Sequence, residues 1–179
     1  MRIYVMRHGK TVWNEKGIIQ GRSNNRLSQN GKTLTQEVSL KYKDTKFDVI
    51  FCSPLMRTMQ TANIMNKYHN VKIFKDERLI EIDQGIFSRR LKSTLTDVEN
   101  EQRQNRDESC SMEKFESVYE RTKDFLEYLK TCGYDSILIV THNINASLIA
   151  DIFNNIEVDF SNDKHLRNFS NADIKCFDL

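Results

Sequence analysis

The apolar residues of this chain gather in short runs separated by mixed or polar stretches. The runs at residues 3–6, 47–52 and 137–141 are nearly continuous and rich in β-branched and aromatic side chains, which predicts strands buried on both faces. A shorter run at 71–74 predicts a further strand, and the loosely alternating tail at 172–179 predicts a strand at the edge of the sheet.

Between these runs, apolar residues recur at helical spacing and predict helices over residues 31–43, 54–68, 112–130 and 146–153. Ser53 and Pro54 suit the N-cap and the first position of the second helix. Gly133 is a typical residue to end the third. Strands that alternate with helices in this way predict an α/β fold with a mainly parallel central sheet.

Two polar segments interrupt this alternation. Residues 14–31 are rich in Gly and Asn, and a loop of this length is typical of a functional site, because structureless loops beyond about 12–15 residues are otherwise uncommon. Residues 85–111 are also polar, with weak helical periodicity, and we expect them to form a variable, cap-like excursion. No repeat or linker divides the chain, so we expect a single domain over residues 1–179.

Charge and cysteine content narrow the class of protein. A formal net charge of +2 results from 27 basic and 25 acidic side chains, which argues against a protein that binds nucleic acid by bulk charge. No apolar run has the length of a membrane span, and the first residues lack the pattern of a secretion signal, so we expect no membrane partner. The four cysteines form no paired motif, which favours reduced thiols and a cytoplasmic location.

Polar side chains of related chemistry follow three of the predicted strands. Arg7 and His8 end the first, Arg57 follows the second at the start of a helix, and His142 follows the run at 137–141. Because the carboxyl ends of parallel strands meet at one edge of a sheet, we expect these four side chains to converge. Two forked cations, two imidazoles and a helix start favour a compact anion, and a phosphoryl group is the best candidate.

Each of these residues alone is more often structural. A single histidine after a strand is usually a buried or capping residue, and a single arginine is usually a solvated surface group. Their combination at three strand ends favours a functional site. A metal site is disfavoured, because neither histidine has a partner at metal-ligand spacing and the arginines would repel a cation. We therefore expect no metal and no cofactor.

The anion pocket also predicts the chemistry of the histidines. An imidazole can attack a clamped phosphoryl group and form a phosphohistidine that water later hydrolyses. This reaction needs an acid for the leaving alkoxide and then a base for the water. Glu81 is the best candidate, although a solvated loop carboxylate is the alternative reading of this residue and Asp83 is a nearby competitor.

Taken together, these blocks resemble the histidine phosphatase superfamily, whose fold is phosphoglycerate mutase-like. The matching motifs, in chain order, are Arg7-His8-Gly9 with Thr11 and Asn14, Ser53-Pro54-Leu55-x-Arg57 with Thr61-Ala62, Glu81 with Gly85, and Thr141-His142. The resemblance implies a three-layer α/β/α sandwich without a metal. It also implies that His8 is the phosphorylated nucleophile, that Glu81 is the acid and base, and that the phosphate is held by Arg7, Asn14, Arg57 and His142.

Further segments resemble the family's first loop and a later motif. Gln20-Gly21-Arg22 resembles the loop between the first strand and the first helix, and with Lys10 it supplies candidate contacts to the distal part of a substrate. Glu108-Ser109 and Arg121 resemble the later motif. Asn143 replaces the glycine that usually follows the second histidine in the family.

Within the family, the choice lies between hydrolysis of a phosphomonoester and phosphoglycerate mutase activity. Pro54 is the only proline and the proline-rich insertion of the mutases is not visible, which favours a phosphatase acting on a small phosphorylated metabolite. The alternatives are a cofactor-dependent mutase and a non-catalytic domain that binds a phospho-ligand or a protein. A non-catalytic domain would be expected to lack His8 or Glu81, and both are present. We expect a monomer or a homodimer.

Overall fold

The computed structural model describes residues 1–160 and 169–178, and its strands form one sheet in the order β3-β2-β4-β1-β5. The strands are β1 (Arg2–Arg7), β2 (Val49–Cys52), β3 (Lys72–Lys75), β4 (Ser136–Thr141) and β5 (Ile174–Asp178). The first four are parallel, and β5 pairs antiparallel with β1 at the edge. The α/β fold with a mainly parallel sheet is therefore confirmed. Residue 179 of the expected edge strand lies outside the described residues.

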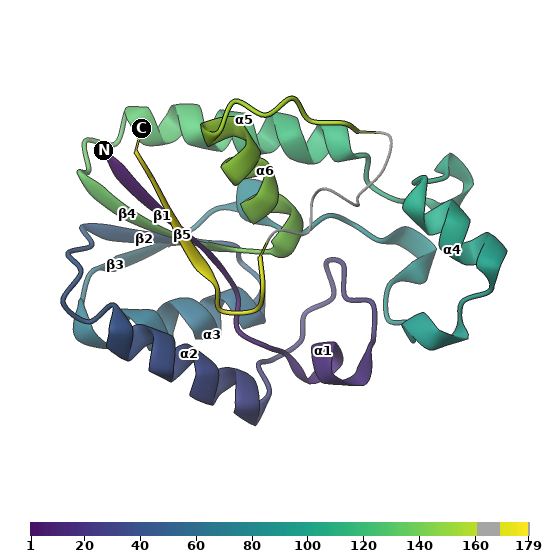
Figure 1. Ribbon diagram of the computed structural model, residues 1–179, viewed down its shortest axis with the longest axis horizontal. Helices are drawn as coiled ribbons and strands as arrows, with labels where there is room; N and C mark the ends of the chain where they lie inside the picture. Colours follow the sequence, from purple (N-terminus) through teal and green to yellow (C-terminus); the bar gives the residue numbers. More distant parts are fainter. Residues whose placement is uncertain (161–168, 179) are drawn as a thin grey trace.

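Helices cover both faces of the sheet and produce the expected three layers (Figure 1). One face is covered by α2 (Gln29–Lys41) and α3 (Met56–Met65), and the other by α5 (Phe115–Lys130) and α6 (Asn143–Phe153). The short helices α1 (Val12–Lys16) and α4 (Asp97–Gln104) lie beyond one end of the sheet. The described 3-10 turns are η1 (Asn66–Tyr68), η2 (Glu77–Leu79), η3 (Gly85–Phe87), η4 (Lys92–Thr94) and η5 (Glu108–Cys110).

Alternate side chains of the strands enter two separate cores, because successive residues of a strand point to opposite faces. Ile3 and Val5 belong to the core that packs against α5 and α6. Met6, Ile50 and Met65 belong to the core that packs against α2 and α3. Full burial of one such side chain contributes roughly 1.5–3 kcal/mol, so both layers hold the strand ends in place.

Two helix starts differ from the expectation. α3 begins at Met56 and its N-cap is Leu55, so Ser53 is not the capping residue. The hydroxyl of Ser53 is engaged at the candidate site, as described below. α6 begins at Asn143, three residues earlier than expected, with His142 in extended backbone at its N-cap. The Ser53 hydroxyl and the His142 ring bond to each other instead of capping these helices.

The polar segment at 14–31 is not wholly a loop. Thr11 and Asn14 exchange hydrogen bonds in a capping box, and this box starts the five-residue helix α1. Gly17 ends the helix in the left-handed region, with a φ of 67°. The remaining loop begins there and leads to Ser28, which caps α2 by accepting a hydrogen bond from the Gly31 N–H.

Residues 85–111 are more helical than expected, because Thr96 and Glu99 form a capping box that starts α4. A β-bridge pairs Leu91 with Ile18, so this excursion contacts the loop that follows α1. Its role as a cap and the extent of the domain stay predictions.

The structure also bears on the cysteines and on the helix lengths. Cys52 and Cys110 are buried, and all four cysteines are free thiols, as the absence of paired motifs predicts. In residues 1–160 and 169–178, no helix combines the length and the hydrophobicity that a membrane span requires.

Candidate active site

The parallel pairing of β1 with β4 brings the two predicted histidines together. Arg7 is the register partner of Thr141, so His8 and His142 each follow the last paired residue of adjacent strands. The His8 N–H extends the ladder by donating to the Thr141 carbonyl at 2.9 Å. The two imidazole rings lie edge to face, with their centroids 5.2 Å apart.

His8 presents an unprotonated ring nitrogen. Its Nδ1 lies 2.7 Å from the Gly9 carbonyl oxygen, which can only accept, so the proton of the neutral ring is on Nδ1 and the lone pair is on Nε2. Burial lowers the pKa of His8 well below 6.5, and the cations Arg57 and Arg7 act in the same direction. His8 is therefore neutral near pH 7, and the neutral form is the one that a nucleophile requires.

His142 has the opposite proton placement, and both of its ring nitrogens have protein partners. Arg57 Nε donates to Nδ1 at 3.2 Å, and a guanidinium has no acceptor, so the ring proton is on Nε2. Nε2 then donates to Ser53 Oγ at 2.8 Å. Burial lowers the pKa of His142 well below 6.5, with Arg57 the next cause. A bond from His142 to a phosphoryl group would therefore require its Nε2–H to leave Ser53.

Arg57 is fully buried at the centre of this group. Besides His142, its guanidinium donates to the carbonyls of Gly21 and Ser23, both at 2.9 Å. These contacts use three of its five N–H groups, so two remain for an anion. Burial lowers the pKa of Arg57 to about 10, and the side chain still carries its charge at neutral pH.

The start of α3 itself offers less to an anion than expected, because the Met56 N–H already donates to Asn24 Oδ1 at 2.7 Å. The cationic groups supply the positive charge instead. Arg7 donates from Nη1 to the Phe169 carbonyl at 2.6 Å, and this bond orients the guanidinium at the end of β1.

A cavity of about 260 Å³ lies in front of these residues. Of the predicted site residues, it is lined by Arg7, Asn14, Gln20, Gly21 and Glu81. Because Arg57 bonds to Gly21, the buried group of His8, Arg57 and His142 lies directly behind the cavity wall. The remaining lining residues are Lys92 and Arg103 of the excursion, Asn143 at the start of α6, and Trp13, Gly17, Ile18, Ile19, Ile82, Gln84 and Ile144.

Among the described residues that line the cavity, the charged side chains are mostly cationic: Arg7, Lys92 and Arg103 are basic, and Glu81 is the one carboxylate. Arg103 was not anticipated from the sequence, because it lies on α4, far along the chain from the other site residues. Asn143, which replaces the usual glycine, lies in ordinary helical backbone, so this position does not require a glycine.

Asn14 and Glu81 are held by local hydrogen bonds. Asn14 Oδ1 accepts from the N–H and the hydroxyl of Thr11, at 3.0 and 2.9 Å, so its Nδ2 group remains to contact a ligand. Glu81 Oε1 accepts from the Ile82 N–H at 3.0 Å. Burial raises the pKa of Glu81 above 4.5, although the nearby cations, Arg57 first, oppose this. A raised pKa suits an acid.

Asp83, the alternative candidate for the acid, lies outside the cavity lining. Its Oδ1 accepts from the Gly85 N–H at 2.9 Å, which makes it a turn residue, and it does not line the cavity. Of the two carboxylates, the structure therefore places Glu81, not Asp83, in the cavity.

The residues predicted to contact the distal part of a substrate differ in their position relative to the cavity. Lys10 is exposed and does not line the cavity. Gln20 lines it, and its Oε1 accepts from Asn25 Nδ2 at 3.0 Å. Arg22 donates to the Glu81 carbonyl at 3.3 Å and to Glu113 at 2.9 Å, at the rim of the site. Substrate contacts of these residues stay predictions.

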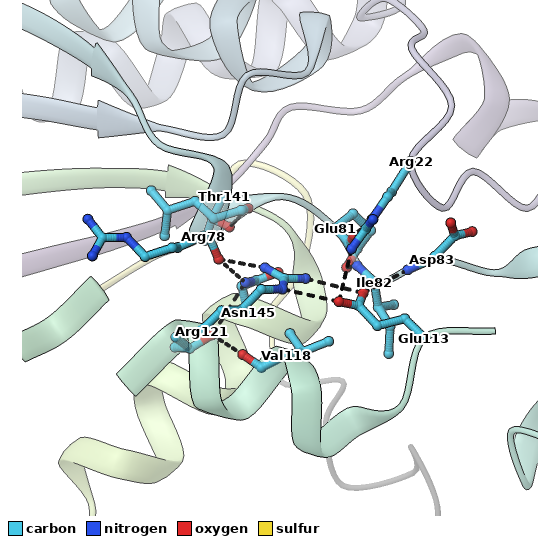
Figure 2. A network of polar contacts seen from close by, with 12 residues as sticks. Arg22, Arg78, Glu81, Ile82, Asp83, Glu113, Val118, Arg121, Thr141 and Asn145 are labelled. Carbon is cyan, nitrogen blue, oxygen red and sulfur yellow. Dashed lines mark hydrogen bonds and ion pairs between the residues drawn. The ribbon is translucent and has the colours of Figure 1, made fainter. Parts of the chain in front are cut away.

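Glu113 is a residue that sequence reasoning missed. The resemblance predicts the later motif at Glu108, but that carboxylate is 81% exposed and pairs with Lys114 at 2.7 Å. Figure 2 shows Glu113 instead beside Arg121, with Nε···Oε1 at 3.3 Å, and at the segment that carries Glu81. Its signal in the sequence was a carboxylate just before the long helix, eight residues ahead of Arg121.

Within the described ranges, no three His, Cys, Asp or Glu side chains come together in a way that could hold a metal ion. The charged groups that act on both histidines include the cations Arg57 and Arg7.

Comparisons with known proteins identify relatives of this chain. Among curated relatives, phosphoserine phosphatase 1 of Hydrogenobacter thermophilus is 29% identical over 151 residues, which cover 80% of this chain and 72% of that protein. The protein named "Probable phosphoglycerate mutase GpmB" of Enterobacter sp. is 35% identical over 99 residues, which cover 55% of this chain and 46% of that protein.

A solved structure shares the fold along the whole chain. The alpha-ribazole phosphatase from Shigella flexneri superposes with a TM-score of 0.83 and 23% identity, covering 100% of this chain and 91% of that one. The family model of the histidine phosphatase superfamily (branch 1) matches residues 3–178. The chain therefore belongs to branch 1 of the histidine phosphatase superfamily.

Proposed function

We propose that this protein is a metal-independent phosphomonoester hydrolase that acts on a small phosphorylated metabolite through a phosphohistidine on His8. The observation that carries the proposal is the proton placement on His8. The Gly9 carbonyl holds the proton on Nδ1, and burial beside two arginines keeps the ring neutral, so Nε2 is available to attack phosphorus. Phosphatase-named relatives support the same class of reaction.

The reaction proceeds in two displacements. In the first, His8 Nε2 bonds to phosphorus as the bond to the substrate's alcohol oxygen breaks, and protonated Glu81 gives its proton to that oxygen. In the second, the Glu81 carboxylate takes a proton from water, the water oxygen bonds to phosphorus, and the phosphorus–nitrogen bond breaks. Inorganic phosphate and the starting forms of both side chains result.

The cations stabilise the charge of the transferring group. Arg57 has two N–H groups to offer, and Arg7 lines the cavity, so both can bind the equatorial oxygens. Asn14 contributes its Nδ2 group. His142 contributes its Nε2–H once that proton turns from Ser53 to a phosphoryl oxygen.

The cavity lining favours a substrate whose alcohol part carries a further negative charge. Lys92 and Arg103 add positive charge to the part of the wall that the excursion contributes, and about 260 Å³ accommodates only a small molecule. The relative named phosphoserine phosphatase acts, by its name, on an ester of this kind.

Phosphoglycerate mutase activity is the second candidate, and the observation in its favour is the 35% identity to the mutase-named relative. A mutase must keep the phosphohistidine from water until an acceptor hydroxyl arrives. Water-driven turnover of the phosphohistidine is therefore the property that separates the two functions.

The decisive experiment measures hydrolysis of p-nitrophenyl phosphate and of small acidic phosphomonoesters in a chelator, with 2,3-bisphosphoglycerate-dependent mutase activity assayed alongside. We expect hydrolysis that persists in the chelator and is abolished in His8→Ala. Unchanged turnover in His8→Ala would exclude the covalent mechanism, and mutase activity that exceeds hydrolysis would establish the second candidate.

The acid is assigned by a matched pair of variants in the same experiment. We expect Glu81→Gln to slow hydrolysis, most strongly for substrates with poor leaving groups, whereas Asp83→Asn retains activity because its carboxylate only caps Gly85. The assignment is wrong if Asp83→Asn shows the leaving-group defect instead.

A further inference from the structure

The segment that carries Glu81 lies outside the sheet, yet side chains from other elements bind it at consecutive residues. Its carbonyls accept hydrogen bonds at Leu79 from Thr141 Oγ1 (2.8 Å) and at Glu81 from Arg22 Nε (3.3 Å), and Ile80 accepts from Asn145 (3.0 Å) in the amide orientation that gives partners to both the oxygen and the nitrogen of that side chain. These donors come from β4, from α6 and from the loop after α1. The backbone position of the proposed acid is thus set by tertiary contacts.

Glu113 is the acceptor at the centre of these contacts (Figure 2). Its Oε2 accepts from the Asp83 N–H at 3.0 Å, two residues after Glu81. Its Oε1 accepts from Arg22 Nη2 at 2.9 Å, and both oxygens accept from Arg121, at 3.3 and 3.4 Å. The carboxylate is only 13% exposed, so solvent screens these bonds little.

Arg22 connects this carboxylate to the acid itself. Its Nη2 donates to Glu113 Oε1, and its Nε donates to the carbonyl of Glu81. Arg22 follows Gln20 and Gly21, which line the cavity, so the rim loop and the acid segment are joined through one side chain. A carboxylate at position 113 is needed because it holds two cations, Arg22 and Arg121, close together without net repulsion.

We propose that Glu113 is a positioning residue for Glu81, and that Arg22 transmits part of this action by binding the Glu81 backbone. The inference rests on the proposed function, because that function makes Glu81 the acid. Glu113 fixes the segment through the Asp83 N–H and neutralises the cations beside it. It touches no reacting atom.

The charges around Glu81 predict the direction in which loss of the Glu113 charge would shift the pKa of Glu81. Arg57 of α3, Arg7 of β1 and Arg121 of α5 each oppose the burial that raises its pKa, and of these Arg121 is bound by Glu113. Removal of the Glu113 charge would leave Arg121 and Arg22 uncompensated. Glu113→Gln should therefore lower the pKa of Glu81 and move the alkaline limb of the pH–rate profile to lower pH.

The first test does not depend on activity. The Glu81 carboxyl is titrated by carbon-13 NMR, with its signal assigned from Glu81→Gln, and amide exchange of Asp83 is measured in the same samples. We expect Glu113→Gln to lower the pKa of Glu81 and to speed exchange of the Asp83 N–H. Glu108→Gln is the matched control, because it removes an exposed carboxylate five residues away, and it should change neither measurement.

The second test separates positioning from a general structural loss. In Glu113→Gln, kcat for an alkyl phosphate should fall about ten-fold or more, a part of the ~10²–10⁴ that a positioned acid contributes, while kcat for p-nitrophenyl phosphate should change little. Arg22→Gln, at a more exposed position, should show the same leaving-group dependence without a lowered pKa of Glu81, because it removes a cation.

An unchanged pKa of Glu81 and unchanged Asp83 exchange in Glu113→Gln would overturn the inference, as would equal losses on both substrates. A wild-type protein that hydrolyses no phosphomonoester would instead overturn the proposed function, and the NMR measurements would still decide whether Glu113 positions Glu81.

Discussion

At the scale of single residues, two histidines on neighbouring strands have been given opposite proton placements by their partners. The carbonyl of Gly9 keeps the His8 proton on Nδ1, and the guanidinium of Arg57 keeps the His142 proton on Nε2. A ring with a lone pair on Nε2 can attack phosphorus, and a ring with a proton on Nε2 can stabilise the phosphoryl oxygens once that proton turns from Ser53. The different roles that we propose for the two histidines thus follow from one acceptor and one donor.

Ser53→Ala tests whether the His142 proton moves to the phosphoryl group. In the ligand-free protein the change leaves a buried N–H without its acceptor, and we expect a loss of about 1–3 kcal/mol in the free energy of unfolding. With saturating phosphate the loss should be smaller, because a phosphate oxygen accepts the same proton. Urea unfolding with and without phosphate measures both values.

The matched control is Ser39→Ala, which removes another buried hydroxyl, one that donates to the Ile64 carbonyl at 3.0 Å far from the cavity. Its loss should be the same with and without phosphate. If phosphate leaves the Ser53→Ala loss unchanged, His142 does not donate to the phosphoryl group.

The pH dependence of kcat/KM should be bell-shaped, with its two limbs set by His8 and Glu81. Phosphorylation needs His8 deprotonated, so activity is lost as pH falls through its pKa, which burial and the arginines hold below 6.5. It also needs Glu81 protonated, so activity is lost as pH rises through its pKa, which burial holds above 4.5. A profile in Glu81→Gln that keeps its alkaline limb would contradict this assignment.

At the scale of elements, the packing of the excursion at residues 85–111 depends on a glycine at its start. Gly85 follows Gln84, which lines the cavity, and its backbone has a φ of +50°. An added Cβ would lie 2.0 Å from the Cys110 carbonyl oxygen, so η3 and η5 pack here with no space for a side chain. This contact holds the two ends of the excursion against each other.

Gly85→Ala should therefore destabilise the protein more than the same change at Gly133. Both glycines have positive φ, so both alanines carry about 1–2 kcal/mol of backbone strain, but no atom lies within 4 Å of a Cβ at Gly133. The overlap at Gly85 adds about 1–3 kcal/mol. Urea unfolding compares the two variants, and equal losses would mean that η5 moves aside freely.

At the scale of the whole molecule, the site is assembled from segments that are distant in the chain. Arg7 ends β1 and His8 follows it, Arg57 lies in the first turn of α3, Glu81 follows η2 and His142 follows β4. Parallel strands bring these ends to one edge, so a ligand that bridges them is bound only by the folded protein.

Inorganic phosphate should consequently stabilise the fold. At a concentration about 100 times its dissociation constant, the gain in the free energy of unfolding should be about 2.7 kcal/mol. Arg57→Met should lose most of this gain, because the guanidinium supplies two N–H groups to the anion. An equal gain in Arg57→Met, seen by calorimetry, would place the bound phosphate elsewhere.

Much of the fold could be predicted because its signals are local. The strand at 137–141 is buried along its length and its first four residues are apolar, and the stripe of the long helix faces the core at Val118 and Phe125. Helix starts were predicted less well. Ser53 has the residue type of an N-cap, but its hydroxyl bonds to His142, 89 residues away.

Of the site, the chain alone determined which chemical groups stand at the strand ends, because a buried strand followed by Arg7 and His8 or by His142 can be identified from neighbouring residues. Only the tertiary structure decided the proton placement on each imidazole, the position of Glu81 rather than Asp83 in the cavity, and the contacts from which we propose a role for Glu113. Each of these depends on hydrogen bonds and burial that join residues far apart in the chain, and spacing along a sequence does not encode distance in space.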